Sequence, residues 1–287
     1  MAWEPPPDFL PAAAPKEACM RKVDFESAGE LMTEYKDSLA FIIDNAFTES
    51  ECQELIKAAE ASTVTPDSPT PKWKRAMINA GKGKEVMVPD SRNCGRILYN
   101  TPDLANRIMD RLRPFFIEAG VDTIYKQGRI TGLGPWRRNE TLQMTRLNEL
   151  LRFLKYEGGE FFRAHCDGAY VTPDQKERSL FTVHLYLNGD GEQDLNELAE
   201  AEAEAEMRPI EEETYTNMDP SGKLLGGATS FHPNLLGYDG GGLRVFPKTG
   251  SVLLFQQRNL WHAGDDVYRG VKYTMRTEIM YKKADQS

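Results

Sequence analysis

The amino-acid sequence predicts an α+β fold, with helices early in the chain and strands after them. Before residue 120, apolar residues recur at helical spacing in two segments. After residue 150, the apolar segments are short, often alternate with polar residues, and are rich in β-branched and aromatic side chains. This segregation along the chain is typical of α+β proteins. A chain of 287 residues can bury one large core or two modest ones.

The first 38 residues predict a mobile tail. They are rich in proline, alanine and charged residues, and at most one short helix is expected near residues 27–34. The folded domain is expected over residues 39–287. Its first element is a buried strand at residues 39–44, because five of these six residues are apolar.

Two helices are expected next. Thr48 and Glu51 predict a capping box, and the helix that follows carries an apolar stripe. The second helix is expected to begin after Thr101 as its cap, with Pro102 in the first turn, and to end at Gly120.

The stretch between these helices, residues 62–92, is polar and interrupted by prolines. A loop of this length is either disordered or functional, so both a solvated loop and a substrate lid remain open. A strand is expected directly after it, at residues 96–99.

Strands dominate the rest of the chain, and they are expected at residues 180–187, 243–246, 251–255 and 271–281. An acidic insertion, residues 188–222, separates the first of these from the others. Its alanine and glutamate content favours a helix, whereas like charges four residues apart oppose one. We expect a solvated excursion that is partly helical or disordered.

Bulk properties exclude several classes of protein. The net charge of −9 is opposite to that of a general nucleic-acid surface. No apolar run is long enough to cross a bilayer, so no membrane association is expected. The first residues lack the features of a secretory signal, and the four cysteines show no paired spacing. We therefore expect reduced thiols and a cytoplasmic or nuclear location.

A candidate metal site is formed by His165, Asp167 and His262. The first two are separated by one residue, so on a strand their side chains share one face, and Cys166 points to the other. Two imidazoles and one carboxylate are the facial ligand set of non-haem Fe(II) oxygenases. The remaining histidines, His184 and His232, are expected to be structural.

Several motifs flank these residues. Tyr156-Glu-Gly-Gly precedes His165, and Lys272 follows His262 by ten residues. Between them lie Gly-Gly-Ala-Thr229 and, at residues 246–250, Phe-Pro-Lys-Thr-Gly. From residue 39 to residue 283 the ordered set resembles the 2-oxoglutarate- and Fe(II)-dependent dioxygenases of the prolyl 4-hydroxylase-like group. The resemblance implies a double-stranded β-helix (jelly roll) with the N-terminal helices packed on one sheet. It also implies Fe(II), 2-oxoglutarate as cosubstrate, ascorbate as reductant, and hydroxylation of a prolyl residue or related aliphatic carbon.

The resemblance further implies that Lys272 holds the far carboxylate of 2-oxoglutarate, with Tyr156 and Thr229 nearby. Arg276 is a second, weaker candidate on the same strand face, and we expect it to pair instead with an acid such as Glu278. Glu278 occupies a position where these hydroxylases often carry tryptophan, so the nature of the substrate is the weakest part of the resemblance.

Two other classes of function remain open. A cupin-type barrel could bind a metal and sense a ligand without turnover, but it would not need Lys272. An interaction module could act through the acidic insertion. The prime substrate, a protein or a small molecule, is not identified by the sequence.

Overall fold

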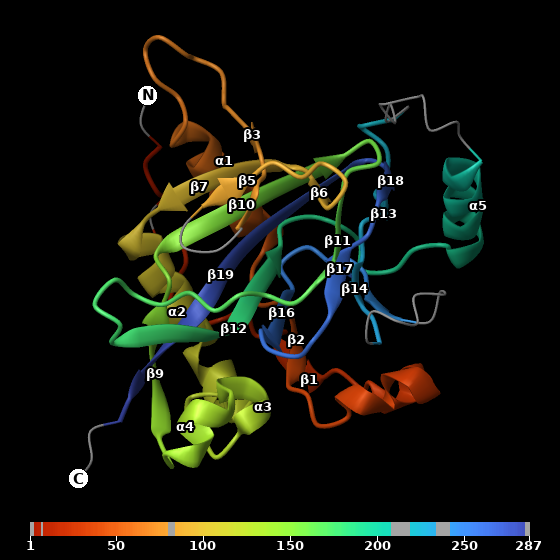
Figure 1. Ribbon diagram of the computed structural model, residues 1–287. Coiled ribbons are helices and arrows are strands. Elements are labelled where there is room, and N and C mark those ends of the chain that lie inside the picture. The colour runs from red at the N-terminus through yellow and green to blue at the C-terminus, as the bar shows by residue number, and fades with distance from the viewer. Residues whose placement is uncertain (1–2, 7, 80–83, 208–218, 234–241, 285–287) are drawn as a thin grey trace.

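The computed structural model describes residues 3–6, 8–79, 84–207, 219–233 and 242–284. Two β-sheets dominate these residues, with helices at their periphery (Figure 1). Every strand pairing between named strands of the described residues is antiparallel. The structure thus confirms a mixed fold of helices with mostly antiparallel sheets. None of the described helices is both long and apolar enough to span a membrane.

The larger sheet has ten strands and its main path runs β1-β2-β16-β12-β19-β10-β7-β3. Strand β8 pairs with β9, which joins the sheet through β19. The strands are β1 Cys19–Lys22, β2 Ala40–Asp44, β3 Lys74–Arg75, β7 Gly95–Asn100, β8 Thr123–Tyr125, β9 Thr141–Leu147, β10 Leu150–Glu157, β12 Glu177–Tyr186, β16 Val252–Gln256 and β19 Val271–Lys283. Each strand expected from the sequence therefore has a counterpart here or in the smaller sheet.

The smaller sheet has five strands in the order β15-β14-β17-β11-β6. They are β6 Arg92–Asn93, β11 Phe161–His165, β14 Thr229–Phe231, β15 Leu243–Val245 and β17 His262–Gly264. Two short pairs stand apart from both sheets: β4 Ile78–Asn79 with β5 Glu85–Val86, and β13 Leu225–Gly226 with β18 Val267–Arg269.

From β10 onward the chain passes back and forth between the two sheets. Strands β10, β12, β16 and β19 belong to the larger sheet, whereas β11, β14, β15 and β17 belong to the smaller one. Side chains from both sheets meet in one buried cluster that includes Tyr186, Phe231 and Phe255. This alternation brings residues near 165 and near 262 onto neighbouring strands.

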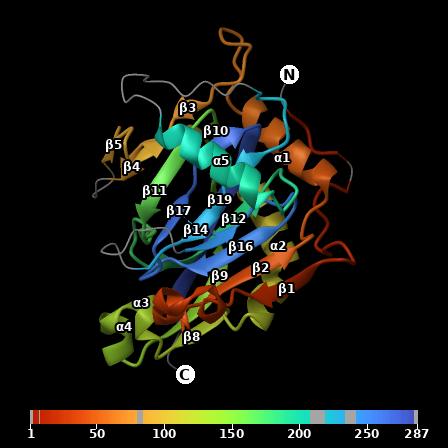
Figure 2. The same ribbon diagram turned by 90° about the vertical axis from the view of Figure 1, so that its right-hand side faces the viewer.

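The helices α1 (Glu49–Ala61) and α2 (Pro102–Glu118) share a second buried cluster with the larger sheet (Figure 2). It includes Phe181 and Val183, the face of β12 opposite to Thr182 and Tyr186. Both halves of the predicted capping box of α1 are present. The prediction for α2 was wrong in one respect, because the Thr101 side chain makes no capping hydrogen bond. Two short helices, α3 (Gly128–Thr131) and α4 (Leu133–Arg137), follow β8.

Residues 8–38 are not a mobile tail, which corrects the prediction. Strand β1 pairs in register with β2, and two 3-10 helices follow at Glu26–Ala28 and Glu30–Tyr35. Phe25, Met32 and Tyr35 are buried against the strands of both sheets. These apolar residues follow no regular period, so the sequence does not mark the segment as structured.

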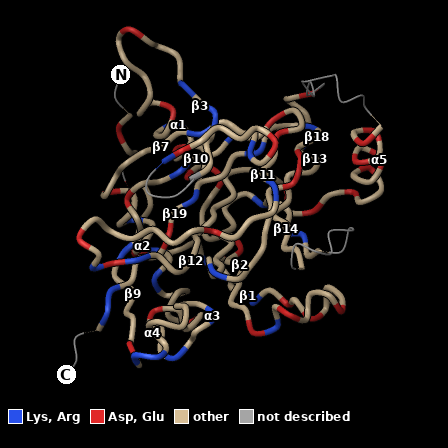
Figure 3. Tube along the Cα trace, viewed as in Figure 1, with Lys and Arg blue, Asp and Glu red and all other residues tan. Residues whose placement is uncertain are grey.

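The acidic insertion contains helix α5 (Leu195–Glu206), so its predicted partial helicity is confirmed; residues 208–218 lie outside the described residues. Asp194 accepts hydrogen bonds from two backbone amides of the first turn. Glu197 pairs with Arg269 at 2.5 Å and Glu202 with Arg244 at 2.7 Å. These ion pairs connect α5 to β15 and β18, and Figure 3 shows the acidic residues of this helix.

Much of the expected loop at residues 62–92 is tied to the sheets, although residues 80–83 lie outside the described part. Strand β3 pairs with β7, and β6 pairs with β11. The Trp73 ring lies 5.7 Å from that of Tyr273, and its indole N–H donates to Glu60 at 3.0 Å. Arg92, at the end of the segment, lines the cavity between the sheets, and the role of the segment as a lid stays a prediction.

Candidate metal centre

His165, Asp167 and His262 come together between the two sheets. His165 ends β11 and His262 begins β17, and the two residues are direct partners across the antiparallel pair. Asp167 follows two residues beyond the end of β11. The strand pairing therefore brings His262 to His165 and Asp167, although it lies almost one hundred residues later in the sequence.

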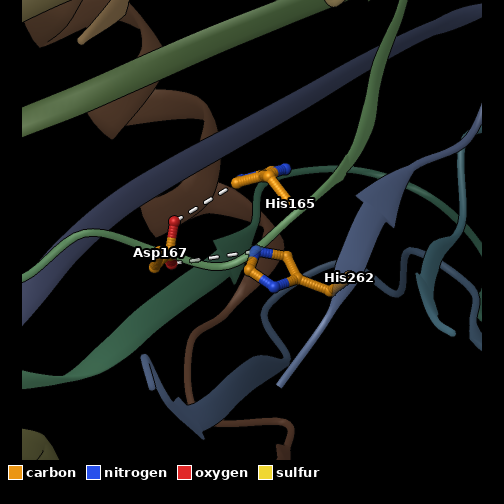
Figure 4. Close-up of side chains that lie close together, drawn as sticks. All are labelled: His165, Asp167 and His262. Carbon is orange, nitrogen blue, oxygen red and sulfur yellow. Dashed lines mark ion pairs between the residues drawn. The ribbon is translucent and has the colours of Figure 1, made fainter. Parts of the chain in front are cut away.

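The geometry suits one small cation (Figure 4). Nε2 of His165 lies 3.5 Å from Oδ1 of Asp167, and Nε2 of His262 lies 3.7 Å from Oδ2. One ligand atom from each residue fits within a span of 4.8 Å. Two imidazole nitrogens and a carboxylate oxygen match the ligand chemistry of a facial Fe(II) site.

Both histidines present the same nitrogen to this point. Nδ1 of His165 lies 2.8 Å from the carbonyl oxygen of Arg163, and Nδ1 of His262 lies 3.1 Å from that of Leu260. A carbonyl oxygen only accepts, so each Nδ1 carries the proton and each Nε2 keeps a free lone pair. The backbone thus fixes the tautomer that can bind a metal.

The charge states also favour a cation. Burial and the neighbouring His165 lower the pKa of His262 to about 3, so it is neutral near pH 7. Burial alone would raise the pKa of Asp167, but Arg276 and the two histidines hold it well below its usual value. Asp167 is therefore ionised and both requirements of a metal ligand are met.

Asp167 is held in place by side chains of the larger sheet. Nη2 of Arg276 lies 2.9 Å from Oδ1, and the Thr182 hydroxyl donates to Oδ2 at 2.5 Å. Arg276 also lies 3.6 Å from Glu278, the partner expected from the sequence. The Glu278 carboxylate in turn accepts hydrogen bonds from the side chains of Arg152 and Asn148, which both approach it to 2.9 Å. A continuous buried network therefore orients the carboxylate from behind.

Lys272 lies in the same cavity, on β19, with only 1% of its surface exposed. Its register partner on β10 is Tyr156, whose ring centroid is 5.0 Å from the Lys272 Nζ. Burial lowers the pKa of Lys272 to about 8. Thr229 lines the cavity too, and its hydroxyl oxygen accepts a hydrogen bond of 2.8 Å from the Tyr186 hydroxyl. The structure thus brings all four sequence-nominated cosubstrate residues around one cavity.

Two further polar residues of the cavity were not nominated from the sequence as site residues. Arg92 of β6 stands beside Phe162, and the Phe162 ring stacks on His165 with centroids 3.7 Å apart. His184 of β12 is opposite Arg276 in register, and its Nε2 is buried without a hydrogen-bond partner in the described structure. The sequence indicated that His184 and Tyr186 lie on the same face of the strand, but it did not indicate that this face lines the cavity. Cys166 is not part of the ligand group, as expected.

Comparison with solved structures shows similarity to hydroxylases and oxygenases. A viral collagen prolyl hydroxylase from Paramecium bursaria Chlorella virus-1 is 18% identical, with a TM-score of 0.45 over 84% of this chain and 95% of that one. A prolyl hydroxylase from Trichoplax adhaerens is 14% identical, with a TM-score of 0.48 over 89% and 90%. A non-heme alpha-ketoglutarate-dependent epimerase of nogalamycin biosynthesis is 14% identical, with a TM-score of 0.40 over 90% and 84%.

Sequence comparisons give no further relatives. No protein-family model matches the chain, and no curated protein sequence matches it. The functional argument therefore depends on the site.

Proposed function

We propose that this protein is an Fe(II)- and 2-oxoglutarate-dependent dioxygenase that hydroxylates a prolyl residue or a related aliphatic carbon. The observation that carries the proposal is the combination of three metal ligands and a buried lysine in one cavity. Three protein ligands leave coordination positions open, as an oxygenase requires. A non-catalytic metal-binding barrel of cupin type would not need the lysine.

In this proposal each cavity residue has a defined task. His165, Asp167 and His262 hold Fe(II), which supplies dioxygen chemistry when it is bound together with 2-oxoglutarate. Lys272 attracts the carboxylate of 2-oxoglutarate that points away from the metal. Tyr156 and Thr229 line the same cavity and carry hydroxyl groups. Succinate and CO₂ leave as the products of the cosubstrate.

The two sheets give the ligands a rigid support. We infer a jelly roll, because the strands from β10 to β19 alternate between facing sheets, with α1 and α2 covering the outer face of the larger one. Ascorbate as reductant and a cytoplasmic or nuclear location remain part of the proposal. The prime substrate is a protein or a small molecule.

The proposal is tested by succinate release from 2-oxoglutarate in the presence of Fe(II) and ascorbate. Slow release is expected without prime substrate, and a cell extract should accelerate it and yield products heavier by one oxygen atom. The Asp167→Ala variant should release none. Metal binding without any cosubstrate binding or succinate release would favour the non-catalytic barrel instead.

A further inference from the structure

One of three buried arginines lacks a carboxylate partner. Among the described residues, Arg92, Arg96 and Arg111 are each exposed by 9% or less. Arg96 makes two hydrogen bonds of 2.9 Å to Glu85, and Arg111 makes two of 2.8 Å to Glu51. Arg92 forms no ion pair with any described carboxylate, and its Nε is buried without a hydrogen-bond partner.

An arginine that is buried without a counter-charge costs folding free energy, since desolvation of the guanidinium is not offset. The protein offsets that cost at Arg96 and Arg111 with paired glutamates. At Arg92 no carboxylate is paired with the guanidinium: its carbon lies 4.4 Å from the centroid of Phe162, and the Cys94 side chain is its hydrogen-bonding neighbour. The guanidinium is thus positioned but not neutralised.

The position of Arg92 is next to the metal centre. Strand β6 pairs Arg92 directly with Phe162 of β11. The Phe162 ring then stacks on His165 at 3.7 Å and 26°. Guanidinium, phenyl ring and metal-binding imidazole form one continuous stack, and Arg92 lines the same cavity as the ligands.

The cavity carries more positive than negative charge, although the chain as a whole carries −9. Its cationic residues are Arg92, Lys272 and Arg276, and its one carboxylate is Asp167. Arg276 is engaged by Asp167 and Glu278. In the proposed function Lys272 binds one end of 2-oxoglutarate and the metal binds the other. Of the three cationic side chains in the cavity, Arg92 is therefore the one without an assigned anionic partner.

We propose that Arg92 binds a carboxylate of the prime substrate, so that the substrate is an acid whose reacting carbon lies close to its anionic group. This inference rests on the proposed function, because it assigns both carboxylates of 2-oxoglutarate elsewhere. The planar fork of an arginine matches a carboxylate with two parallel hydrogen bonds, which a lysine cannot reproduce. Stacking on Phe162 fixes the plane of the fork before the substrate arrives.

The test uses two probes of the same size. N-acetyl-L-proline carries a carboxylate, and N-acetyl-L-prolinamide replaces it with a neutral amide. Each is titrated by calorimetry into Mn(II)-loaded protein that is saturated with 2-oxoglutarate. The acid should bind at least about tenfold more tightly than the amide.

Variants then test whether the preference for the acid over the amide depends on Arg92. Arg92→Gln should bring the two probes to equal affinity while its dissociation constant for 2-oxoglutarate stays within about twofold of wild type. Arg92→Lys should keep part of the preference, since it retains the charge but not the fork. Arg138→Gln, an equal charge change at the exposed residue that follows helix α4, should keep all of it.

Three results would overturn the inference: equal or undetectable binding of both probes to wild type, an unchanged preference in Arg92→Gln, or a loss of 2-oxoglutarate binding in that variant. The last result would make Arg92 a cosubstrate residue. If wild type binds no 2-oxoglutarate at all, the proposed function fails, whereas an acid preference that depends on Arg92 would still identify an anion site.

Discussion

Arg276 forms an ion pair with the carboxylate of Asp167: its Nη2 lies 2.9 Å from Oδ1, the same oxygen that lies nearest to His165 Nε2. This contact separates the roles of the two cations on β19. Arg276 stabilises Asp167, a candidate metal ligand, whereas Lys272 has no ion pair with a described carboxylate, and its Nζ lies 5.0 Å from the ring centroid of Tyr156 on the neighbouring strand. The predictions below follow from this division and from the other buried pairs.

Arg276→Gln should destabilise the metal-free protein by about 3 kcal/mol, because loss of one partner leaves the buried Asp167 charge uncompensated. Glu278 keeps Arg152 and is less affected. Urea unfolding gives the free energy. Lys57→Gln, which removes an exposed pair with Glu54, should change it by less than about 1 kcal/mol. A loss below 1 kcal/mol in Arg276→Gln would show that the pair does not contribute to stability.

Replacement of His165, Asp167 or His262 by alanine should abolish tight binding of Mn(II), measured by calorimetry. Wild type at a metal concentration 100 times its dissociation constant should gain about 2.7 kcal/mol of stability, and the variants should not. His232→Ala is the matched control, because His232 does not line this cavity. Undiminished metal affinity in all three variants would remove the assignment.

Lys272→Gln should weaken the binding of 2-oxoglutarate to the Mn(II)-loaded protein by about 2–5 kcal/mol, the range for truncation of a buried charge pair. Lys155→Gln serves as the control, since Lys155 pairs with Glu157 and does not line the cavity. If Arg276→Gln loses cosubstrate binding while Lys272→Gln retains it, the two cations have been assigned the wrong way round.

The affinity for 2-oxoglutarate should depend on the protonation of Lys272. Burial lowers its pKa to about 8, so the free protein carries the charge below that pH and loses it above. The dissociation constant should be flat between pH 6.5 and about 7.5 and rise as the pH passes 8. Lys272→Arg, which stays charged, should shift this rise to higher pH. An identical pH profile in both proteins would exclude Lys272 as the titrating group.

Loss of the Glu51 side chain should lower the free energy of unfolding more than loss of the Thr48 side chain, its partner in the capping box. Thr48→Ala removes one capping bond and should cost about 1 kcal/mol. Glu51→Ala also removes the two hydrogen bonds that Arg111, only 1% exposed, makes to a carboxylate, and should cost about 3–5 kcal/mol. Thermal or urea unfolding distinguishes the two. Equal losses would mean that the Arg111 pair adds nothing to the cap.

The sequence predicted the parts of this structure that depend on local patterns. The capping box of α1, the alternation in β12 and the spacing between His165 and Asp167 are all set by residues a few positions apart. The approach of His262 was inferred from an ordered set of motifs, and the structure places it opposite His165.

Other features depend on contacts between distant residues, which no local pattern reports. The pairing of Arg276 with Asp167 and the stack of Arg92 on Phe162 both cross between strands that are far apart in sequence. Burial of Phe25 and Met32 depends on strands that come two hundred residues later. Hence the grouping of His165, Asp167 and His262 was predictable, whereas the charged side chains that contact this group were not.

Strand β19 has a consequence for how the protein is made. It lies between β10 and β12, which pair with it along most of their lengths. A ribosome that has completed Glu157 must still add residues up to 271–283, which takes roughly 5–25 s at usual elongation rates. Until then the edge of β10 that pairs with β19 is unpaired, as is that of β12 once it has been made, and exposed edges invite pairing with other chains. Nascent chains of this protein should therefore need chaperone protection until their last strand emerges, and a product that stops before it would lack Lys272 as well as the central strand of its larger sheet.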